Sequence, residues 1–176
     1  MLINLTDIFQ SEQKISEQEV LFTPDEVTSF GETVQIVRKE PSIMKLSNEG
    51  KGKIAVTGHM DLTLAMVCDR CLKPMEVPVS FDYEEHITED GLTNPEDADE
   101  FFYMDGSKFD VDQYLGNEIL INWPPKVLCK DDCKGICKVC GKDLNLGECG
   151  CDDFVPDPRM AVIKDIFNIA NADKEV

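Results

Sequence analysis

The eight cysteines of this chain, above all the six that fall within 23 residues, limit most strongly what it can fold into. The six are Cys129, Cys133, Cys137, Cys140, Cys149 and Cys151. A tetrahedral zinc site takes four such ligands, usually as two closely spaced pairs that the fold brings together. Because thiols stay reduced in the cytosol, close pairs there indicate metal ligands before they indicate disulfides. The spacing therefore predicts a C-terminal zinc-binding module.

Two of the pairs are best suited to a single site. The run from Cys137 to Cys140 has two residues between its thiols and is followed by Gly141, which is typical of a zinc knuckle. Glycine there can take the positive φ that turns backbone amides toward sulfur. Cys149 and Cys151 supply a second close pair. We expect these four thiols to hold a structural zinc ion, since all-cysteine ligation leaves no open position for catalysis.

The other four thiols leave alternatives open. Cys129 and Cys133 either replace one pair of the first site or join Cys68 and Cys71 in a second one. Such a second site would tie the module to the hairpin described below. Cys68 and Cys71 lack a following glycine, and they are equally explained as reduced cysteines packed like small apolar residues. The expected cofactor is thus one zinc ion, or two.

Apolar side chains are too few to order this segment by themselves. The large ones between the first and last of the six cysteines are Ile136, Val139, Leu144 and Leu146. Full burial of these four contributes about 6 to 12 kcal/mol, whereas ordering the backbone costs roughly 1 to 2 kcal/mol per residue. A structural zinc site contributes on the order of 10 to 16 kcal/mol. A metal therefore closes much of the gap.

The charge balance selects among partners. With 35 acidic and 17 basic residues the formal net charge is -18, which repels nucleic-acid phosphates and anionic membranes and favours basic proteins. The cysteine-rich segment is locally basic through Lys126, Lys130, Lys134, Lys138 and Lys142. These lysines serve either solubility and thiolate neutralisation or contact with RNA.

Two alternating runs predict an antiparallel hairpin. Apolar residues alternate with polar ones from Ile54 to Met66, interrupted at Gly58, and again from Met75 to Ile87, interrupted at Glu85. Cys68 and Cys71 lie between the runs, so we place them at the hairpin tip. Weaker strand patterns cover residues 34–37, 43–46 and 100–104, and an acidic loop is expected around residues 94–100.

Two helices are expected. Asp110 is a candidate N-cap for a helix that ends before Pro124, and Asp157 is a candidate N-cap for a last helix. The fold class is therefore α+β: an antiparallel sheet or partly closed small barrel, a few helices and the zinc module. We expect residues 1–123 to form the β domain and residues 124–176 to form the zinc module with the last helix.

No motif of catalysis or membrane insertion is found. The chain has no run of about 20 apolar residues, and its N-terminus lacks a basic segment followed by an apolar run, so we expect it in the cytoplasm. Nothing resembles a catalytic triad, a phosphate loop or a dinucleotide fingerprint. His59 and His86 fall on the polar sides of strands and are interpreted as surface residues. We expect neither an active site nor a small-molecule substrate.

Four further segments stand out in the chain, and they are Val67–Leu72, Trp123–Cys129, Cys133–Asn145 and Asp157–Asp165. Together they resemble the YceD family of large ribosomal RNA subunit accumulation proteins. The resemblance covers roughly residues 50 to 167, and residues 1–50 carry little of it. It implies a role in making or maintaining large-subunit ribosomal RNA, in a family whose gene often lies beside that of a small basic ribosomal protein.

The leading hypothesis is a non-enzymatic factor in large-subunit biogenesis. Its acidic middle would bind a basic ribosomal protein, while the lysine-bearing module and the hairpin would approach the large-subunit rRNA precursor. The alternative is a thiol redox switch or redox-controlled chaperone, in which oxidation expels zinc and exposes apolar surface. A transcription-associated zinc ribbon is a third hypothesis, which the net charge disfavours.

Overall fold

The computed structural model describes residues 1–29, 31–89 and 101–151. Its contacts separate two compact units, which are Met1–Asp69 with Lys73–Cys129, and Arg70–Leu72 with Lys130–Val176. The expected acidic loop at residues 94–100 lies outside the described residues. The expected helix that begins after Asp157 also lies outside them. The domain boundary expected at residue 124 stays a prediction.

The first unit is built around one long hairpin. Strand β6, Lys53–Val67, pairs antiparallel with β7, Pro74–Thr88, over their whole length, from Lys53 opposite Thr88 to Val67 opposite Pro74. The alternation predicted this hairpin, and it is confirmed. Each strand turns one set of alternate side chains to the core and the other to solvent, because side chains alternate across a strand.

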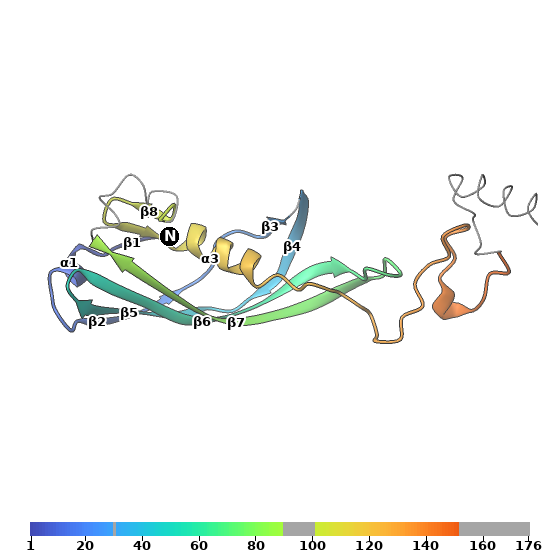
Figure 1. The fold of residues 1–176 in the computed structure, drawn as a ribbon, viewed down its shortest axis with the longest axis horizontal. Coiled ribbons are helices and arrows are strands. Elements are labelled where there is room, and N and C mark those ends of the chain that lie inside the picture. The colour runs from blue at the N-terminus through green and yellow to red at the C-terminus, as the bar shows by residue number, and fades with distance from the viewer. Residues whose placement is uncertain (30, 90–100, 152–176) are drawn as a thin grey trace, which may run out of the picture. The chain divides into compact units, whose positions relative to one another are not determined.

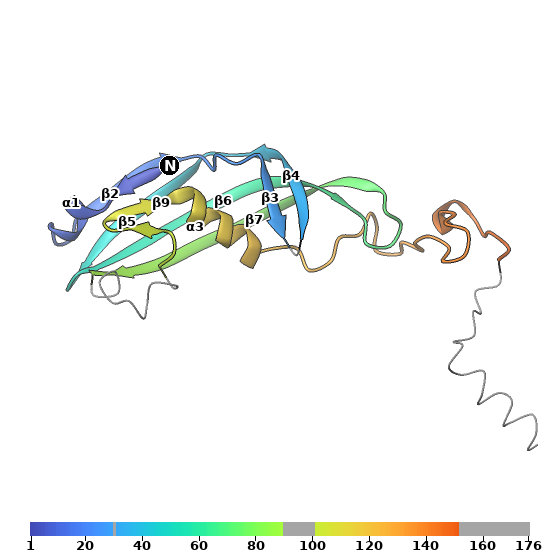
Figure 2. The same cartoon turned by 90° about the horizontal axis from the view of Figure 1, so that it is seen from above.

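The second edge of β6 is shared by two other strands. Strand β5, Ser42–Gly50, pairs with the first part of β6, and β4, Glu32–Lys39, pairs with the last part. Strand β2, Ile15–Val20, then pairs with β5, and β3, Glu26–Ser29, pairs with β4. The order is β2-β5-β6-β4-β3, with β7 paired to β6 (Figures 1 and 2). All these pairs are antiparallel, as expected.

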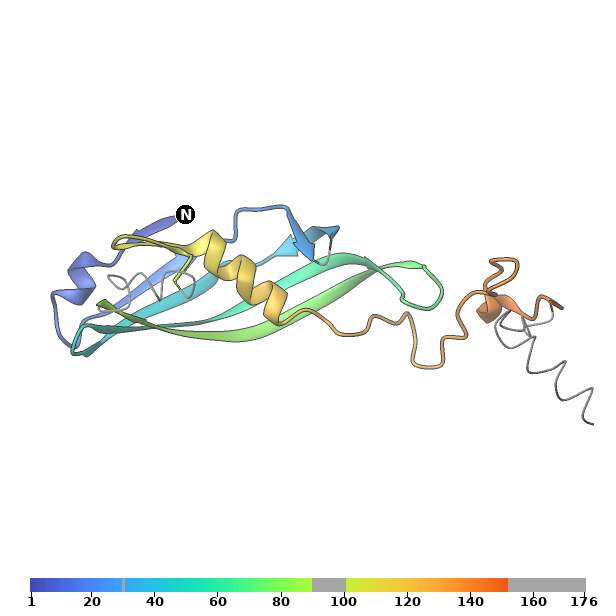
Figure 3. The same ribbon diagram turned by 45° about the horizontal axis from the view of Figure 1, so that its top comes forward.

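A second layer covers one face of this sheet. It contains helix α3, Val111–Ile121, and a small sheet of β1, β9 and β8 (Figures 1 and 3). The strands of the small sheet are Leu2–Asn4, Lys108–Asp110 and Met104–Asp105, and a short helix α1 covers Thr6–Phe9. The side chain of Asp110 accepts hydrogen bonds from the amides of Asp112 and Gln113, which confirms the predicted N-cap.

One sequence expectation needs correction. The apolar run at residues 100–104 was expected to form a strand, but Phe101 and Tyr103 lie in a turn and only Met104 begins β8. The reason is packing: Phe101 and Tyr103 are buried, and the Tyr103 ring packs edge-on against Phe109 and Tyr114 at centroid distances of 5.4 and 5.3 Å. Aromatic burial here outweighs local strand propensity.

The core lies between α3 and the large sheet. Helix α3 buries Val111, Tyr114, Leu115 and Ile119 against core-facing side chains of β5, β6 and β7. Tyr83 from β7 packs edge-on to Tyr114, with centroids 5.9 Å apart, and its hydroxyl lies 2.8 Å from Ser42 Oγ. This core forms without any contribution from the cysteine-rich segment.

Candidate metal centres

Four thiols of the second unit form what we call the knuckle cluster. The cluster consists of Cys137, Cys140, Cys149 and Cys151. Their sulfur atoms all lie within 4.8 Å of one another. Tetrahedral zinc with Zn–S bonds of about 2.3 Å requires sulfurs about 3.8 Å apart, a spacing that this arrangement allows. The four residues predicted as the best site are therefore brought together.

Backbone turns create the first half of this cluster. Gly141 has φ +74°, and its amide donates to the carbonyl of Cys137 at 2.9 Å. The amide of Val139 points to the Cys137 sulfur at 3.4 Å, as the knuckle interpretation predicted. A side chain at position 141 would be strained by the positive φ, which explains the glycine.

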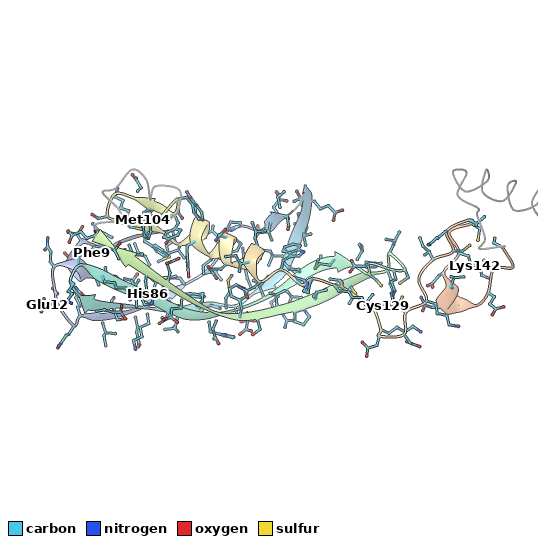
Figure 4. The ribbon with its side chains drawn as sticks, viewed as in Figure 1. Phe9, Glu12, His86, Met104, Cys129 and Lys142 are labelled. Atoms are coloured by element: carbon cyan, nitrogen blue, oxygen red, sulfur yellow. The ribbon has the colours of Figure 1, made fainter. Side chains whose placement is uncertain are left out.

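A short 3-10 turn leads to the second half. Element η2, Leu144–Leu146, is capped by the Asp143 carboxylate, which accepts from the Asn145 amide at 2.8 Å. Gly150, between Cys149 and Cys151, has φ +71° and lets the two sulfurs face the same point. Lys142 Nζ donates to the carbonyl of Glu148 at 2.9 Å and holds this loop (Figure 4).

The crowding of the sulfurs shifts their acidity in opposite directions. Hydrogen bonds from the amides of Cys140 and Val139 lower the pKa of Cys137 to about 7. Sharing of protons with the thiols of Cys140 and Cys149 raises the pKa of Cys151 to about 12. Four thiols this close cannot all ionise together, because their negative charges repel. A divalent cation removes that conflict, which is the chemistry of a structural zinc site.

The remaining thiols form a second group, which we call the hairpin cluster. It consists of Cys68, Cys71, Cys129 and Cys133, and their sulfurs also lie within 4.8 Å of one another. Three of the four are buried and Cys129 is half-buried. Of the alternatives left open by the sequence, this arrangement corresponds to a second four-cysteine group rather than to an exchange of ligands in the first. Both clusters could hold a metal ion.

Sequence reasoning missed two residues that shape the second unit. Arg70 Nη1 donates to the carbonyl of Cys133 at 2.8 Å, and the Arg70 carbonyl accepts from the amide of Ile136 at 3.1 Å. Gly135, with φ +78°, lies close to the backbone of Arg70. A Cβ at position 135 would lie 2.9 Å from the Arg70 carbonyl oxygen. Nothing in the sequence around Arg70 indicates that it hydrogen-bonds to the backbone of residues 133 and 136.

Asn145 is the other missed residue. Its Oδ1 accepts from the Lys134 amide at 2.9 Å, and its Nδ2 donates to Asp143 Oδ1 at 2.7 Å and approaches the Cys133 sulfur at 3.5 Å. A single amide group thereby links residues 133 and 134 to the turn that contains Asp143. Such outer groups orient metal ligands. The Leu-Asn pair after the knuckle was the available signal.

The five lysines proposed for RNA contact are all exposed. Lys130 lies 3.6 Å from Asp132, and Lys142 is engaged with the Glu148 carbonyl. Their assignment to RNA stays a prediction.

The solvent face of the hairpin carries a polar network that the sequence did not reveal. His59 Nδ1 lies 2.7 Å from Asp82 Oδ1, and its Nε2 lies 3.1 Å from Ser80 Oγ and 3.2 Å from Asp61 Oδ2. The order serine, histidine, aspartate resembles that of a catalytic triad. However, a carboxylate lies beside each ring nitrogen, and in the protonated ring both nitrogens donate, so that form cannot accept the proton of Ser80. The network is exposed, in keeping with the interpretation of His59 as a surface residue.

This network makes a pH-dependent prediction. The hydrogen bond to Asp82, and then the nearby Asp61 carboxylate, raise the pKa of His59 above 6.5. Because the folded-state pKa is raised, the stabilisation is fully present below about pH 6.5 and is lost as pH rises through the folded-state pKa. An NMR titration should give a pKa above 6.5 for His59, and Asp82→Asn should lower it.

The matched control is Glu76→Gln, which removes a carboxylate from the same strand outside the network. It should leave the His59 titration almost unchanged. Equal shifts in the two variants would mean that general surface charge, and not the short contact with Asp82, sets the pKa.

The fold and its thiols define the class: an antiparallel β-sheet protein with a cysteine-rich segment and two groups of four cysteines that could hold metal. A family model described as "Large ribosomal RNA subunit accumulation protein YceD" matches residues 56–167, which is more than half of the chain. The chain belongs to the YceD family, as its sequence motifs predicted. Comparisons with curated proteins and with solved structures found no significant match. None of the described helices is long and apolar enough to cross a membrane.

Proposed function

We propose that this protein is a non-enzymatic cytoplasmic factor in large ribosomal subunit biogenesis that binds a basic ribosomal protein. The observation that carries the proposal is the family match, whose description names accumulation of large-subunit ribosomal RNA. Charge supports the choice of partner. Residues 1–123 contain 25 acidic and 9 basic side chains, whereas residues 124–151 contain 5 lysines and 4 acidic side chains. The acidic part attracts basic proteins and repels RNA.

The cysteine-rich segment has a separate role in this proposal. Zinc ions held by the knuckle cluster, and by the hairpin cluster, order a segment that has few buried apolar side chains of its own. In the second unit Val139 and Leu146 are 55% and 84% exposed, so hydrophobic burial contributes little there. The ordered segment then presents its exposed lysines to precursor rRNA.

Gradient sedimentation of cell lysate tests the proposal. The protein should migrate with precursor large subunits, and its deletion should lower the ratio of large-subunit to small-subunit rRNA. Small-subunit precursors in the same gradient serve as the control. Absence from precursor large-subunit fractions, together with a normal rRNA ratio in the deletion strain, would count against a role in assembly.

A redox switch is the second candidate, because each cluster holds four sulfurs within 4.8 Å. Peroxide would take two electrons from a pair of thiolates, which yields a disulfide and water and releases the metal. Mass spectrometry after mild peroxide separates the two functions. Disulfides that form quickly and expose a dye-binding surface support the switch, and slow reaction supports structural metal.

A further inference from the structure

An apolar groove runs between helix α3 and the segment that contains β3, all within the first unit. Its volume is about 350 Å³. Phe22 and Val27 line one wall, and Gly116 and Leu120 line the other, with Phe102 beside them. Phe102 and Leu120 are 46% and 40% exposed, so two large apolar side chains stay partly in contact with water. A concave site of this size with mostly apolar walls and a few polar groups is a candidate binding site.

Helix α3 has two distinct faces. One buries Tyr114, Leu115 and Ile119 in the core. The other turns a stripe at helical spacing toward the groove, formed by Gln113, Gly116, Asn117 and Leu120. Positions three and four apart lie on the same side of a helix, so the stripe is continuous. The core therefore accounts for only one of the two faces.

Gly116 is the unexplained residue of that stripe. Glycine inside a helix is unfavourable compared with alanine. A Cβ at this position would lie 3.7 Å from the Phe22 ring, which is an ordinary van der Waals contact, and the residue does not have a positive φ. Packing among the described residues therefore does not require glycine. A larger side chain at position 116 would fill the floor of the groove.

The charges around the groove select its occupant. Residues 20–29 and 109–122, which supply most of its walls, contain five carboxylates and no lysine or arginine. From elsewhere in the chain, Lys39 pairs with Asp25 at 2.8 Å, and the N-terminal ammonium of Met1 lies 2.6 Å from Asp112 and 4.0 Å from Asp110. Two cations against five carboxylates leave the surroundings of the groove net negative. Glu26 accepts a hydrogen bond from the side-chain amide of Gln35 at 2.8 Å, and this neutral partner does not offset the carboxylate. A second copy of this chain, with its net charge of -18, would be repelled.

We propose that this groove binds a segment of a basic large-subunit ribosomal protein that carries a large apolar side chain among lysines and arginines. The apolar residue enters above Gly116, where the absent side chain leaves room, and the cationic residues lie along the acidic walls. Gln113 and Asn117 offer amide groups to the backbone of the bound segment. This inference rests on the proposed function and names the site that would perform it.

Site-specific photo-crosslinking with the full-length protein tests the groove. A crosslinker at Asn117 is irradiated with the proteins extracted from large ribosomal subunits, and a crosslinker at the exposed Glu17 on β2 serves as the control. The captured protein is identified by mass spectrometry, and its affinity is then measured by fluorescence anisotropy. Gly116→Leu should weaken binding at least 10-fold, whereas Gly116→Ala should raise the Tm.

Leu120→Lys provides a second variant at an exposed position, where no repacking is needed, and it should also weaken binding at least 10-fold. The proposal is supported if one basic protein is captured from position 117 and not from position 17, and if Gly116→Leu and Leu120→Lys both weaken its binding. Capture of a second copy, capture of rRNA alone, equal capture at both positions, or unchanged affinity in both variants would overturn it. If both variants lose no affinity and still migrate with precursor large subunits, the groove is not the binding site and the proposed function stands. If the unmodified protein does not migrate with those precursors, the proposed function itself fails.

Discussion

Replacement of Cys137 and Cys140 by serine should remove one zinc ion from each chain and unfold the second unit, while the hairpin of the first unit stays folded. Two of the four knuckle ligands are lost, and two remaining thiols do not hold zinc at a structural site. The free energy that zinc binding contributes, on the order of 10 kcal/mol, is lost from a segment with little apolar core. We therefore expect that segment to lose nearly all of its ordered structure.

Native mass spectrometry measures the loss of metal, and hydrogen exchange measures the unfolding of the second unit. The metal count should fall by one, and amides of residues 134–151 should lose protection while those of β6 and β7 keep theirs. The double variant Lys138→Ala and Val139→Ala is the matched control, since it changes both residues between the cysteines and leaves the thiols. Val139 is 55% exposed, so its truncation should cost little.

The result would contradict a structural metal if the serine variant kept its metal count, or if it lost the metal and kept its amide protection. Removal of metal by a chelator should reproduce the serine variant. Protection that survives the chelator would mean that side-chain contacts alone order the second unit.

Gly58→Ala should lower the free energy of unfolding by about 3 kcal/mol, the upper part of the usual range for overpacking a core. Gly58 lies directly opposite Tyr83 in the β6–β7 register. A Cβ at position 58 would overlap the ring and hydroxyl of Tyr83. That ring cannot move aside freely, because it is buried, packs against Tyr114 and is joined to Ser42.

Urea denaturation of the variant measures this loss. Gly116→Ala is the matched control, because it makes the same chemical change in the same unit where a Cβ has room. It should stabilise the protein by up to about 1 kcal/mol through helix propensity. Opposite signs for the two glycines are the expected result.

A double variant separates the overlap from other causes. Tyr83→Leu alone loses aromatic contacts, but in the Gly58→Ala background it also relieves the overlap. The two changes together should therefore cost less than their sum, with an interaction energy of about 1 to 3 kcal/mol. Strict additivity would show that Gly58 is needed for a reason other than Tyr83.

Local patterns were enough to predict several elements. The alternation from Ile54 to Ile87 predicted the hairpin with its cysteine tip, because a strand with one buried face must alternate. Asp110 predicted the start of α3, since its side chain satisfies amides only two and three residues away. These interactions join residues close in sequence or repeat with a fixed period.

Other features were missed because they depend on register and on contacts between distant segments. The first fifty residues supply four strands of the large sheet, but their weak patterns did not indicate which edge each would pair with. The partners of His59 on β7 are set by the alignment of two fifteen-residue strands. A shift of one residue in that alignment would have placed them on the other face.

By itself the sequence determined that eight thiols in close pairs would be available for metal, that one hairpin would form, and that the chain would be strongly acidic. Only the tertiary structure decided that the thiols divide into two groups of four, that Gly58 accommodates Tyr83, and that Gly116 opens a groove. Spacing along the chain limits which atoms can meet locally. Which distant atoms meet depends on how the strands pair and how the helix packs on the sheet, and those choices are made by the whole core at once.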